Sequence, residues 1–555
     1  IENGVRQCVL CPGSRSSALV LAVHEQDHIL ETTVHYDERG AAFFALGMAL
    51  GSARPVMMIV TSGTAVANAL PAVVEASLSH VPLIICSADR PPELRDTEAN
   101  QTITQPHLFG ANVRWFFDLP CPSDDVAQKR FLSSTMRHAV SRATLGDPGP
   151  VHLNFMFREP LVPRGDRGCP PELVSPDPSP VSVQIQGEFL AWPQELEQRM
   201  RSVSRGLLII GQLAGASERV AAINLANALG WPVLADVTSG VKHLAGPTSL
   251  IGHYDLLLSD DDFSEAMAPE LVVHLGGRIV SKSLAQYLTR SAPATYVLLQ
   301  AHSRRHDPDF LVTHTVVGSL AVHGDVIASC LAGANVDSAW VDTWTRADQR
   351  LAAGLDGLIG AEHLSELSVS RWISHALRAS HGLFLSNSLP VREMDMVGAP
   401  FNGAISLAAN RGASGIDGIV ASAAGFARGL QRPVVLIVGD LALLHDLNSL
   451  SLLRTGPPVT IVVFNNDGGG IFSMLPIADH ESVFERYFGT PHGLGFEKAA
   501  GMFGLDYMNP TSQDEFASGF QSRMAAATSG ILEIKTNRTA NADEIRKLRG
   551  RARQA

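Results

Sequence analysis

The sequence predicts an α/β protein built from three doubly wound, parallel-sheet domains. Its 555 residues correspond to three or four domains of about 150 residues each, so a single core is excluded. Short apolar runs, such as 56–60 and 434–438, alternate with stretches of helical composition, which indicates strands covered on both faces. Residues 37–63 and 410–440 also repeat one order: a turn, a helix of small residues, and a buried strand. We therefore expect two related domains that flank a middle domain of the same class.

The boundaries between these domains are predicted from composition. Six prolines between 163 and 182 interrupt the pattern and predict a linker at 166–182, after a first domain at 1–165. A change to helical composition near Asp337 predicts a central domain at 183–336 and a third domain at 337–555. The chain reaches its first apolar run soon after Ile1, so we expect that an N-terminal helix is missing from this sequence.

Composition and charge argue against several classes of function. Charged residues make up 18% of the chain, hydrophobic residues 45%, and the net charge of -12 disfavours a nucleic-acid partner. No apolar run approaches the roughly 18 residues of a membrane-spanning helix, so membrane insertion is not expected. The six cysteines are scattered, and Cys8 and Cys11 lie in one apolar run, so we expect structural thiols in a reducing, cytoplasmic compartment. A small-molecule substrate is the remaining expectation.

The most informative residues follow the predicted strands. In open α/β sheets ligands bind at the carboxyl ends of the strands, where helix N-termini present free N–H groups. Gly439–Asp440 ends one buried strand, and Asn465–Asn466 ends the next. A carboxylate, a carboxamide and the carbonyl of Gly468 or Gly469 are the hard oxygen ligands that Mg²⁺ prefers. The sequence therefore predicts a magnesium site at this sheet edge.

This spacing resembles the signature of thiamin diphosphate enzymes, whose magnesium ion anchors the diphosphate of the cofactor. Such enzymes also need a screened carboxylate beside the aminopyrimidine ring, because burial raises a carboxyl pKa toward neutrality. Glu38 follows a predicted strand and precedes the apolar helix 41–50, and the resemblance implies that it is the catalytic glutamate. The alternative is a glutamate that only complements the dipole of its helix.

Six segments extend the resemblance over essentially the whole chain. They are CPGSRSS at 11–17, HYDERG at 35–40, TSGTAVAN at 61–68, ADRPPEL at 88–94, NRGASGID at 410–417 and GGGIFSML at 468–475. Together they resemble the 2-succinyl-5-enolpyruvyl-6-hydroxy-3-cyclohexene-1-carboxylate synthase family of menaquinone biosynthesis. The resemblance is closest in the first and last thirds of the chain.

The resemblance implies a transferase that decarboxylates 2-oxoglutarate on thiamin diphosphate and adds the succinyl carbanion equivalent to isochorismate. It implies three domains of the thiamin diphosphate enzyme type, which are pyrimidine-binding, central and diphosphate-binding. It also implies Mg²⁺, with Mn²⁺ as a substitute, and a homodimer or homotetramer. These substrates carry several carboxylates, and arginines at strand ends are suited to bind them through two parallel hydrogen bonds.

The site residues that the resemblance implies form three groups. The residues expected at the cofactor are Ser14, Glu38, Thr61, Gly63, Ile416, Gly439, Asp440, Asn466, Gly468 and Ile471. The residues expected to hold the metal ion are Asp440, Asn466 and Gly468. The residues expected at the substrates are Arg15, Arg90, Gln101, Lys282, Ser388, Arg392, Arg411, Phe472 and Leu475. Ser283 stands where a second basic residue is expected, so the distal acid contact is expected to be weaker or to come from Arg278.

Three other functions remain as alternatives. A pyruvate-using thiamin diphosphate enzyme of the acetolactate synthase type needs less cationic charge than the four arginines among these residues provide. A nucleotide-binding oxidoreductase would use the loop Gly211–Gly215, which lacks the pattern G-x-G-x-x-G. A serine hydrolase would need the G-x-S-x-G elbow, which residues 412–415 break.

Overall fold

The computed structural model describes residues 1–162 except 124, 194–333 except 243, 245, 246 and 248, 335–359, 364–401 and 403–553. The linker predicted at 166–182 lies outside these residues. The chain forms two compact units, of which the first contains Ile1–Gln186, Asn410–Val434 and Ala442–Val459. The second contains Gly187–Ala409, Val435–Leu441 and Thr460–Ala555.

The first unit contains a parallel sheet of six strands in the order β2-β1-β3-β4-β6-β5. Its strands are β1 (Gln7–Leu10), β2 (Glu31–Val34), β3 (Val56–Val60), β4 (Leu83–Asp89), β5 (Trp115–Leu119) and β6 (Val151–Met156). β4 is buried along its whole length, as expected for a central strand covered on both faces. Cys8 of β1 pairs with Met57 of β3. These two strands are therefore neighbours in the sheet, although residues 11–55 lie between them in the sequence.

The helices of the first unit begin where the sequence supplies capping residues. They are α1 (Ser17–His24), α2 (Glu38–Ser52), α3 (Thr64–Ala67), α4 (Leu70–Leu78) and α5 (Val126–Thr144), with short turns η1 (Pro92–Leu94) and η2 (Gly110–Asn112). Asp37 caps α2 by accepting hydrogen bonds from the N–H groups of Arg39 and Gly40. Asp125 caps α5 in the same way.

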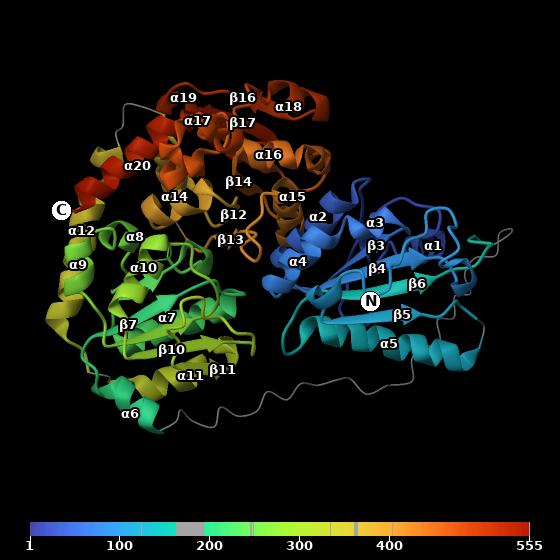
Figure 1. Cartoon of the computed structure of the whole chain (residues 1–555), viewed down its shortest axis with the longest axis horizontal. Helices are drawn as coiled ribbons and strands as arrows, with labels where there is room; N and C mark the ends of the chain where they lie inside the picture. Colours follow the sequence, from blue (N-terminus) through green and yellow to red (C-terminus); the bar gives the residue numbers. More distant parts are fainter. Residues whose placement is uncertain are drawn as a thin grey trace. The chain divides into compact units, whose positions relative to one another are not determined.

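The two helices of the internal repeat pack against each other within the first unit. α2 contacts α15 (Ile419–Leu430), and the turn η4 (Leu447–Arg454) packs beside α15 (Figure 1). A Cβ on Gly47 would lie 2.0 Å from the carbonyl oxygen of Ser422, and one on Gly425 would lie 2.0 Å from that of Phe44. The small residues that the sequence repeats therefore allow the two backbones to touch.

The third sheet has the same strand order as the first, β13-β12-β14-β15-β17-β16. Its strands are β12 (Gly382–Leu385), β13 (Ser406–Ala408), β14 (Val434–Gly439), β15 (Val459–Asn465), β16 (Asp506–Met508) and β17 (Gly530–Lys535). The helices and turns of this part in the second unit are α13 (Glu366–Ala376), α14 (Leu389–Val397), η5 (Gly470–Met474), η6 (Pro476–Asp479), α17 (Glu481–Phe484), η7 (Glu485–Gly489), α18 (Glu497–Phe503), α19 (Gln513–Ala525) and α20 (Arg538–Ala552). The helix α16 (Asp440–His445) begins in the second unit and continues into the first at Ala442. The relationship predicted between the first and last thirds is therefore confirmed at the level of topology.

The middle sheet has five parallel strands in the order β11-β10-β9-β7-β8. Its strands are β7 (Gly206–Ile210), β8 (Val233–Ala235), β9 (Leu271–Leu275), β10 (Thr295–Gln300) and β11 (His314–Val317). The elements around it are α6 (Gln194–Ser202), α7 (Ala216–Leu229), η3 (Val237–Ser239), α8 (Tyr254–Leu257), α9 (Asp261–Ala266), α10 (Lys282–Ser291), α11 (Leu320–Leu331) and α12 (Ser338–Ile359). The prediction of three doubly wound, parallel-sheet domains is confirmed.

The core of the middle sheet includes a helix that the sequence places after the boundary at 337. Trp340 and Trp344 of α12 are buried in one cluster with Leu207 of β7 and Val272 of β9. The ring of Trp344 meets that of Phe263 edge to face, with 5.1 Å between centroids. The boundary at 337 stays a prediction, since a packed core rather than a composition change defines where one domain ends.

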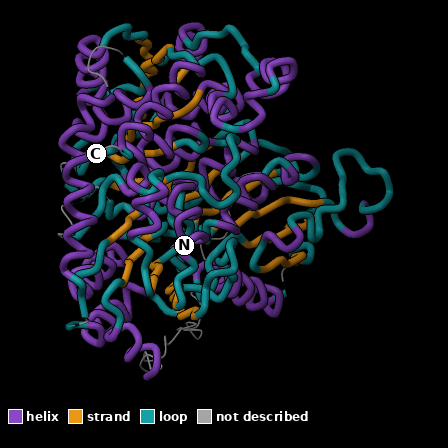
Figure 2. The backbone as a smooth tube through the Cα atoms, turned by 60° about the vertical axis from the view of Figure 1, so that its left-hand side comes forward, coloured by secondary structure: helices purple, strands orange, loops and turns teal. Residues whose placement is uncertain are grey.

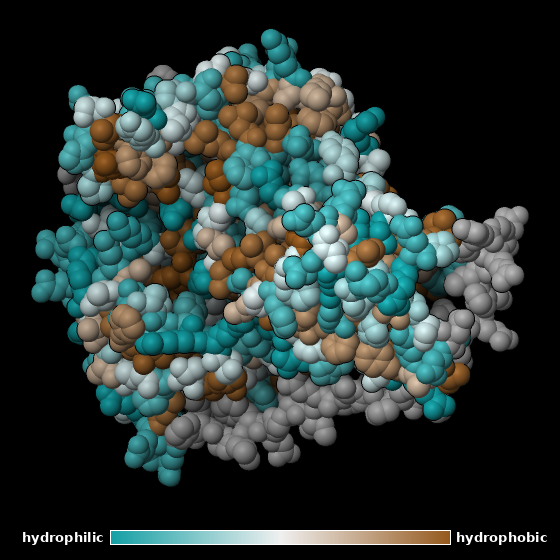
Figure 3. Space-filling view, turned by 45° about the vertical axis from the view of Figure 1, so that its right-hand side comes forward, coloured by the Kyte–Doolittle hydropathy of each residue, from teal (hydrophilic) through white to brown (hydrophobic). Residues whose placement is uncertain are grey.

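Strands and helices alternate in both units, and Figure 2 draws the strands among the helices. On the face drawn in Figure 3, polar and apolar residues are interspersed. The large apolar side chains with more than half of their surface exposed include Val34, Tyr36, Phe310, Tyr487 and Met502. No helix in the described part of the chain is long and apolar enough to cross a membrane.

Candidate functional site

The loops that follow β1 and β3 meet at the point where the strand order of the first sheet reverses. These strands are neighbours, and such a switch point is where open α/β sheets bind ligands. A Cβ on Gly13 would lie 2.2 Å from the Cβ of Thr61, so glycine allows the two loops to approach. The hydroxyl of Thr61 is buried and has no hydrogen-bond partner among the described residues, whereas Ser14 is exposed. The loops thus present one unused hydroxyl at the sheet edge.

Two buried guanidinium groups lie beside these loops. Arg15 donates to the carbonyl oxygen of Phe157 at 3.1 Å, and Arg90 donates to the Ser62 hydroxyl and to the carbonyl oxygen of Asn100. Burial lowers the pKa of Arg90 and the charge of Arg15 lowers it further, whereas the carboxylates of Asp89 and Glu159 raise it. Two cations held this close favour an anionic ligand, because a carboxylate between them would relieve their repulsion.

Gln101 joins the same cluster. Its side chain donates to the carbonyl oxygen of Ser62 at 2.9 Å, and its backbone has a φ of 55°. A Cβ on Gly63 would lie 3.0 Å from the Cγ of Gln101, so this glycine is in close contact with it. The N–H of Gly63 donates to the buried side chain of Gln105 at 2.9 Å. The structure therefore brings Arg90, Gln101 and Gly63 together around Ser62.

Glu38 is the first residue of α2 and is half-buried in the first unit. The amide of Asn68 donates to Glu38 Oε2 at 3.3 Å. Burial raises the pKa of the Cys11 thiol, and the negative charge of Glu38 raises it further. Glu38 therefore lies near the end of β1, beside the switch point.

The loop 410–418 carries Arg411 and Ile416 in the same unit. Glu75 of α4, which is 2% exposed, accepts hydrogen bonds from the N–H groups of Gly412 and Ala413 at 2.7 and 2.6 Å. This contact fixes the start of the loop. Ile416, in the same loop, is 37% exposed.

In the second unit, Asp440 lies at the equivalent switch point of the third sheet, after β14. It is 2% exposed, and its Oδ1 accepts from the N–H of Leu441 at 2.7 Å. Its Oδ2 accepts from the N–H of Gly468 at 2.9 Å and from Nε2 of His492 at 3.1 Å. The carboxylate predicted to bind a metal ion and the glycine loop after β15 are thus in direct contact.

The two asparagines at the end of β15 differ in their partners. Asn465 uses both ends of its amide, because it donates to Glu533 and Leu494 and accepts from the N–H of Asp467. Asn466 is 7% exposed and donates to Glu366 Oε1 at 3.0 Å, while its Oδ1 is buried without a hydrogen-bond partner in the described ranges. An orphaned oxygen at this place suits a cation.

The glycine loop after Asn466 is shaped by contacts with the segment near 489. Gly468 has a φ of 132°, and a Cβ on it would lie 1.9 Å from the carbonyl oxygen of Gly489. No group of three or more His, Cys, Asp and Glu side chains that could hold a metal ion occurs among the residues described. One carboxylate, one carboxamide and one backbone carbonyl do not make such a group, because only the carboxylate belongs to one of these four side-chain types.

The apolar residues predicted to line the pocket follow this loop. Ile471 and Phe472 are half-buried in η5, and Leu475 is 39% exposed. The ring of Phe472 meets that of Phe488 at 5.6 Å and 70°. Phe472 therefore has a packing partner within the fold, whereas Leu475 has much of its surface free.

Ser388 and Arg392 lie beside the end of β12, the neighbour of β14 in the sheet. Ser388 has a φ of 72°, a conformation that non-glycine residues rarely adopt, and its carbonyl oxygen accepts from Arg392 at 2.6 Å. Backbone strain of this kind is found at ligand-binding positions, where surrounding contacts hold it in place.

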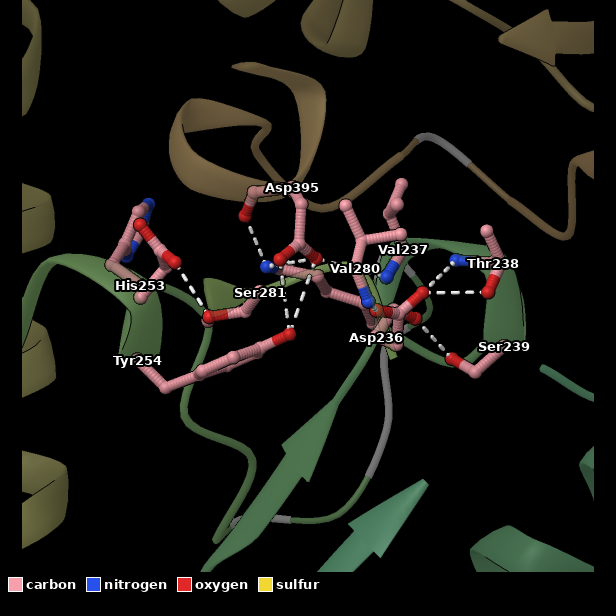
Figure 4. Close-up of polar contacts among 12 residues, drawn as sticks. Asp236, Val237, Thr238, Ser239, His253, Tyr254, Val280, Ser281 and Asp395 are labelled. Carbon is pink, nitrogen blue, oxygen red and sulfur yellow. Dashed lines mark hydrogen bonds and ion pairs between the residues drawn. The ribbon is translucent and has the colours of Figure 1, made fainter. Parts of the chain in front are cut away.

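The helix that carries Arg392 is anchored by a buried polar network, drawn in Figure 4. Oδ1 of Asp395 accepts from the N–H of Val237 at 2.9 Å and from Nζ of Lys242 at 2.8 Å, while the Tyr254 hydroxyl donates to Oδ2 at 3.0 Å. Nζ of Lys242 also lies 4.5 Å from the centre of the Tyr254 ring. Burial raises the pKa of Asp395 to about 6, against the opposing effect of Lys242.

Lys282 begins α10, after the end of β9 and at the switch point of the middle sheet. Ser281 caps this helix by accepting from the N–H of Leu284, and it donates to Asp255. Lys282 and Arg278 are exposed, but Ser283 is only 7% exposed. Ser283 therefore lies on the inner side of α10, and the exposed cations of this segment are Arg278 and Lys282.

Three family models match the chain. Residues 1–108 match the thiamine pyrophosphate enzyme N-terminal TPP-binding domain, 185–385 the middle domain of thiamine pyrophosphate enzymes, and 402–534 the C-terminal TPP-binding domain. The chain is also 45% identical to 2-succinyl-5-enolpyruvyl-6-hydroxy-3-cyclohexene-1-carboxylate synthase from Rubrobacter xylanophilus, over 98% of this chain and 94% of that protein. The chain belongs to this synthase family of thiamine pyrophosphate enzymes.

Other members of the synthase family are nearly as similar. The proteins of the same name from Salinibacter ruber and Chloroflexus aurantiacus are 39% and 41% identical, over 98% and 97% of this chain and 93% and 92% of theirs. Among solved structures, benzoylformate decarboxylase from Polynucleobacter necessarius has a TM-score of 0.68 at 17% identity and covers 96% of both chains. That likeness shows the fold alone.

The predicted site residues can be placed within the matched domains. Glu38 is within the matched N-terminal TPP-binding domain, and Asp440, Asn466 and Gly468 are within the C-terminal one. Glu38 belongs to the first unit and Asp440 to the second. Sequence reasoning missed Gln105, His492 and Glu366, which contact predicted site residues. No motif surrounds them in the sequence, so only their contacts reveal them.

Proposed function

We propose that this chain decarboxylates 2-oxoglutarate and adds the succinyl unit to isochorismate, using thiamin diphosphate and Mg²⁺. The observation that carries the proposal is the pair of buried guanidinium groups of Arg15 and Arg90 at the first switch point. A substrate with more than one carboxylate suits such a pair, whereas pyruvate, with one carboxylate, needs less. The relatives that bear the name of this synthase over nearly the whole chain support the same choice.

The cofactor, when bound, supplies the nucleophilic carbon and the electron sink that decarboxylation of a 2-oxo acid requires. In this proposal Glu38 holds a proton at the aminopyrimidine ring, and Ile416 packs against the cofactor. Ser14, Thr61, Gly63, Gly439 and Ile471 are the other residues proposed to bind the cofactor. The unused hydroxyl of Thr61 and the exposed side chain of Ile416 support these roles.

Mg²⁺ would be held by Asp440, Oδ1 of Asn466 and the carbonyl of Gly468. The support is the contact between Asp440 and Gly468, together with the orphaned oxygen of Asn466. We expect Asp440→Ala to lose Mg²⁺-dependent binding of thiamin diphosphate, measured by calorimetry with and without metal. Asp514→Ala is a control, because Asp514 is an exposed carboxylate in the first turn of α19 in the same unit. Equal loss in both variants would contradict the assignment of Asp440.

The substrates would be held by cations from several strand ends. In the proposal, Arg15, Arg90, Gln101 and Lys282 lie at the substrate site. Ser388, Arg392 and Arg411 contact the intermediate derived from 2-oxoglutarate. Phe472 and Leu475 supply apolar surface. We also propose domains at 1–165, 183–336 and 337–555, a homodimer at least, and a cytoplasmic location. The described cysteines Cys8, Cys11, Cys86 and Cys121 are free thiols, which supports a reducing compartment.

The decisive experiment mixes the purified chain with thiamin diphosphate, Mg²⁺, 2-oxoglutarate and isochorismate and follows the loss of isochorismate absorbance. We expect turnover that depends on all four additions. A parallel reaction contains pyruvate in place of 2-oxoglutarate. A cofactor-bound sample that turns over pyruvate and leaves 2-oxoglutarate unused would overturn the proposal and favour an acetolactate synthase type of enzyme.

The carboxylate-binding role has its own test. Arg90→Lys keeps the positive charge but loses the planar fork, so we expect a higher KM for a substrate and a smaller change in kcat. Arg158→Lys is the matched control, since Arg158 is exposed and pairs with Glu93 on the surface of the same unit. Unchanged kinetics in Arg90→Lys would contradict the assignment of this arginine.

A further inference from the structure

The amide of Asn466 has two chemically different ends, and only one can bind a cation. Its oxygen accepts and its NH₂ group donates, so the direction in which the amide points decides whether the residue can be a Mg²⁺ ligand. In the structure the NH₂ group donates to Glu366 Oε1 at 3.0 Å, and Oδ1 is left without a partner in the described part of the chain. The partner of the NH₂ group therefore determines which atom is available to a metal ion.

Glu366 is rigidly held where it meets this amide. It is the first residue of α13, is 1% exposed, and follows a capping box formed by Ser365 and Ser368. Its Oε1 also accepts from the hydroxyl of Thr536 at 2.7 Å. With the amide reversed, two oxygens would face each other about 3 Å apart, at a cost comparable to leaving a buried acceptor unsatisfied. Glu366 Oε1 thus selects one orientation of Asn466.

A second buried carboxyl group lies beside Glu366. Glu393 of α14 is close enough to Glu366 for their charges to interact, and the Oε2 atoms of both are buried without a hydrogen-bond partner among the residues that the structure describes. Burial raises the pKa of Glu393 well above its ordinary value, and the charge of Glu366 raises it further. Glu393 Oε1 is held in turn by the amide of Asn541 in α20, at 2.9 Å.

We propose that Glu366 is a positioning residue for the metal site, which turns the oxygen of Asn466 toward the cation. The inference rests on the proposed function, in which Asn466 is a Mg²⁺ ligand. Glu366 does not touch the ion in this scheme. It acts through the amide, as carboxylates beyond the ligands do at other metal sites, where their loss weakens metal binding about 10- to 100-fold. The same glutamate contacts α14 through Glu393, the residue that follows Arg392.

The test uses the full chain and measures the Kd of Mg²⁺ at saturating thiamin diphosphate by calorimetry. Glu366→Met removes the acceptor and should raise this Kd about 10- to 100-fold. Glu366→Gln keeps an acceptor for Asn466 and Thr536 and can donate to Glu393, so its Kd should rise less than about 10-fold. Thr536→Val is a further control, because it removes a bond to Glu366 without touching Asn466.

A double-variant cycle separates positioning from a purely structural role. If Glu366 acts through the amide oxygen, Glu366→Met has no further effect on the Mg²⁺ Kd in an Asn466→Ala background. An equal loss in both backgrounds would overturn the inference, as would a wild-type Kd in a folded Glu366→Met variant. Should Glu366→Met not fold, Glu366→Asp is measured in its place, because it withdraws the acceptor by one methylene and keeps the carboxyl group. A wild-type chain that binds thiamin diphosphate without Mg²⁺ would overturn the proposed function itself, and the inference with it.

Discussion

Glu75 binds the backbone of Gly412 with one carboxylate oxygen and that of Ala413 with the other, although 337 residues separate Glu75 from Gly412. The two bonds are 2.7 and 2.6 Å long, and Glu75 is 2% exposed. This contact holds the loop that carries Arg411 and Ile416 against α4. It is also one of the contacts that place residues 410–434 in the first unit.

Glu75→Ala should destabilise the first unit and loosen this loop. Each N–H left unpaired and buried costs about 1–3 kcal/mol, so the free energy of unfolding in urea should fall by at least one such amount. Glu75→Gln should cost less, because its oxygen can still accept from one N–H. Glu2→Ala, a change at an exposed glutamate, serves as a control. Equal stability of Glu75→Ala and Glu2→Ala would contradict the importance of the contact.

Gly47→Ala should separate α2 from α15. Its new Cβ would lie 2.0 Å from the carbonyl oxygen of Ser422, a backbone atom that cannot swing away. Overpacking of this kind typically costs about 1–3 kcal/mol. Gly354→Ala is the matched control within helix α12, because nothing lies within 4 Å of its added Cβ, and it should stabilise by about 0.5–1 kcal/mol. Thermal melts of the two variants should therefore shift in opposite directions.

Glu38→Gln should bind thiamin diphosphate normally but lose most activity. The amide is the same size as the carboxyl group, so α2 and its Asp37 cap remain, but it cannot exchange a proton with the cofactor. Loss of a positioned acid or base typically costs about 100- to 10,000-fold in rate. Steady-state kinetics and calorimetry measure the two quantities, with Glu25→Gln at an exposed site as the control. Full activity in Glu38→Gln would remove Glu38 from the proton relay.

The carboxyl group of Asp446 should make stability depend on pH. Burial raises its pKa from 3.8 to about 6, although it accepts hydrogen bonds from the Ala421 N–H and the Ser449 hydroxyl. The folded state therefore binds the proton more tightly than the unfolded state between these two pH values. The contribution of this group to the free energy of unfolding is greatest below pH 3.8. It falls by about 3 kcal/mol in total as the pH rises toward 6.

Asp446→Asn should remove this component. The amide can still accept from Ala421 and can donate to Ser449, so the fold is expected to persist. Between pH 3.8 and about 6, the free energy of unfolding of the variant should fall less steeply than that of the wild type. Urea titrations at several pH values measure the difference. Parallel pH profiles for the two proteins would show that the buried carboxyl group is not linked to folding.

Lys242→Met should be strongly destabilising. It removes the cation that pairs with Asp395 and leaves a buried carboxylate alone, which typically costs about 3–5 kcal/mol. Because Asp395 lies on α14, the affinity for 2-oxoglutarate should fall as well. Lys498→Met is the control, as Lys498 is exposed in the same unit. If the two variants unfold at the same urea concentration, the Lys242–Asp395 pair contributes no net stability.

The sequence by itself determined the class of this protein and where its chemistry would lie. Strand runs buried on both faces and the repeated small-residue helices predicted three parallel sheets, two of them related, because such patterns are local and periodic. The turns that follow the strands made Glu38, Asp440 and Asn466 the predicted site residues, since the end of a predicted strand is visible in the sequence.

Only the tertiary structure shows which residues distant in the sequence contact these predicted site residues. Glu366 binds Asn466 across 100 residues, and His492 binds Asp440 across 52. Lys242 and Asp395 pair across 153 residues. The Trp side chains of α12 pack with β7 and β9, beyond the boundary that composition predicted at 337. No local sequence pattern predicts such contacts, because the hydrogen-bond or ion-pair partner of a buried charge or amide comes from whichever element the fold packs against it.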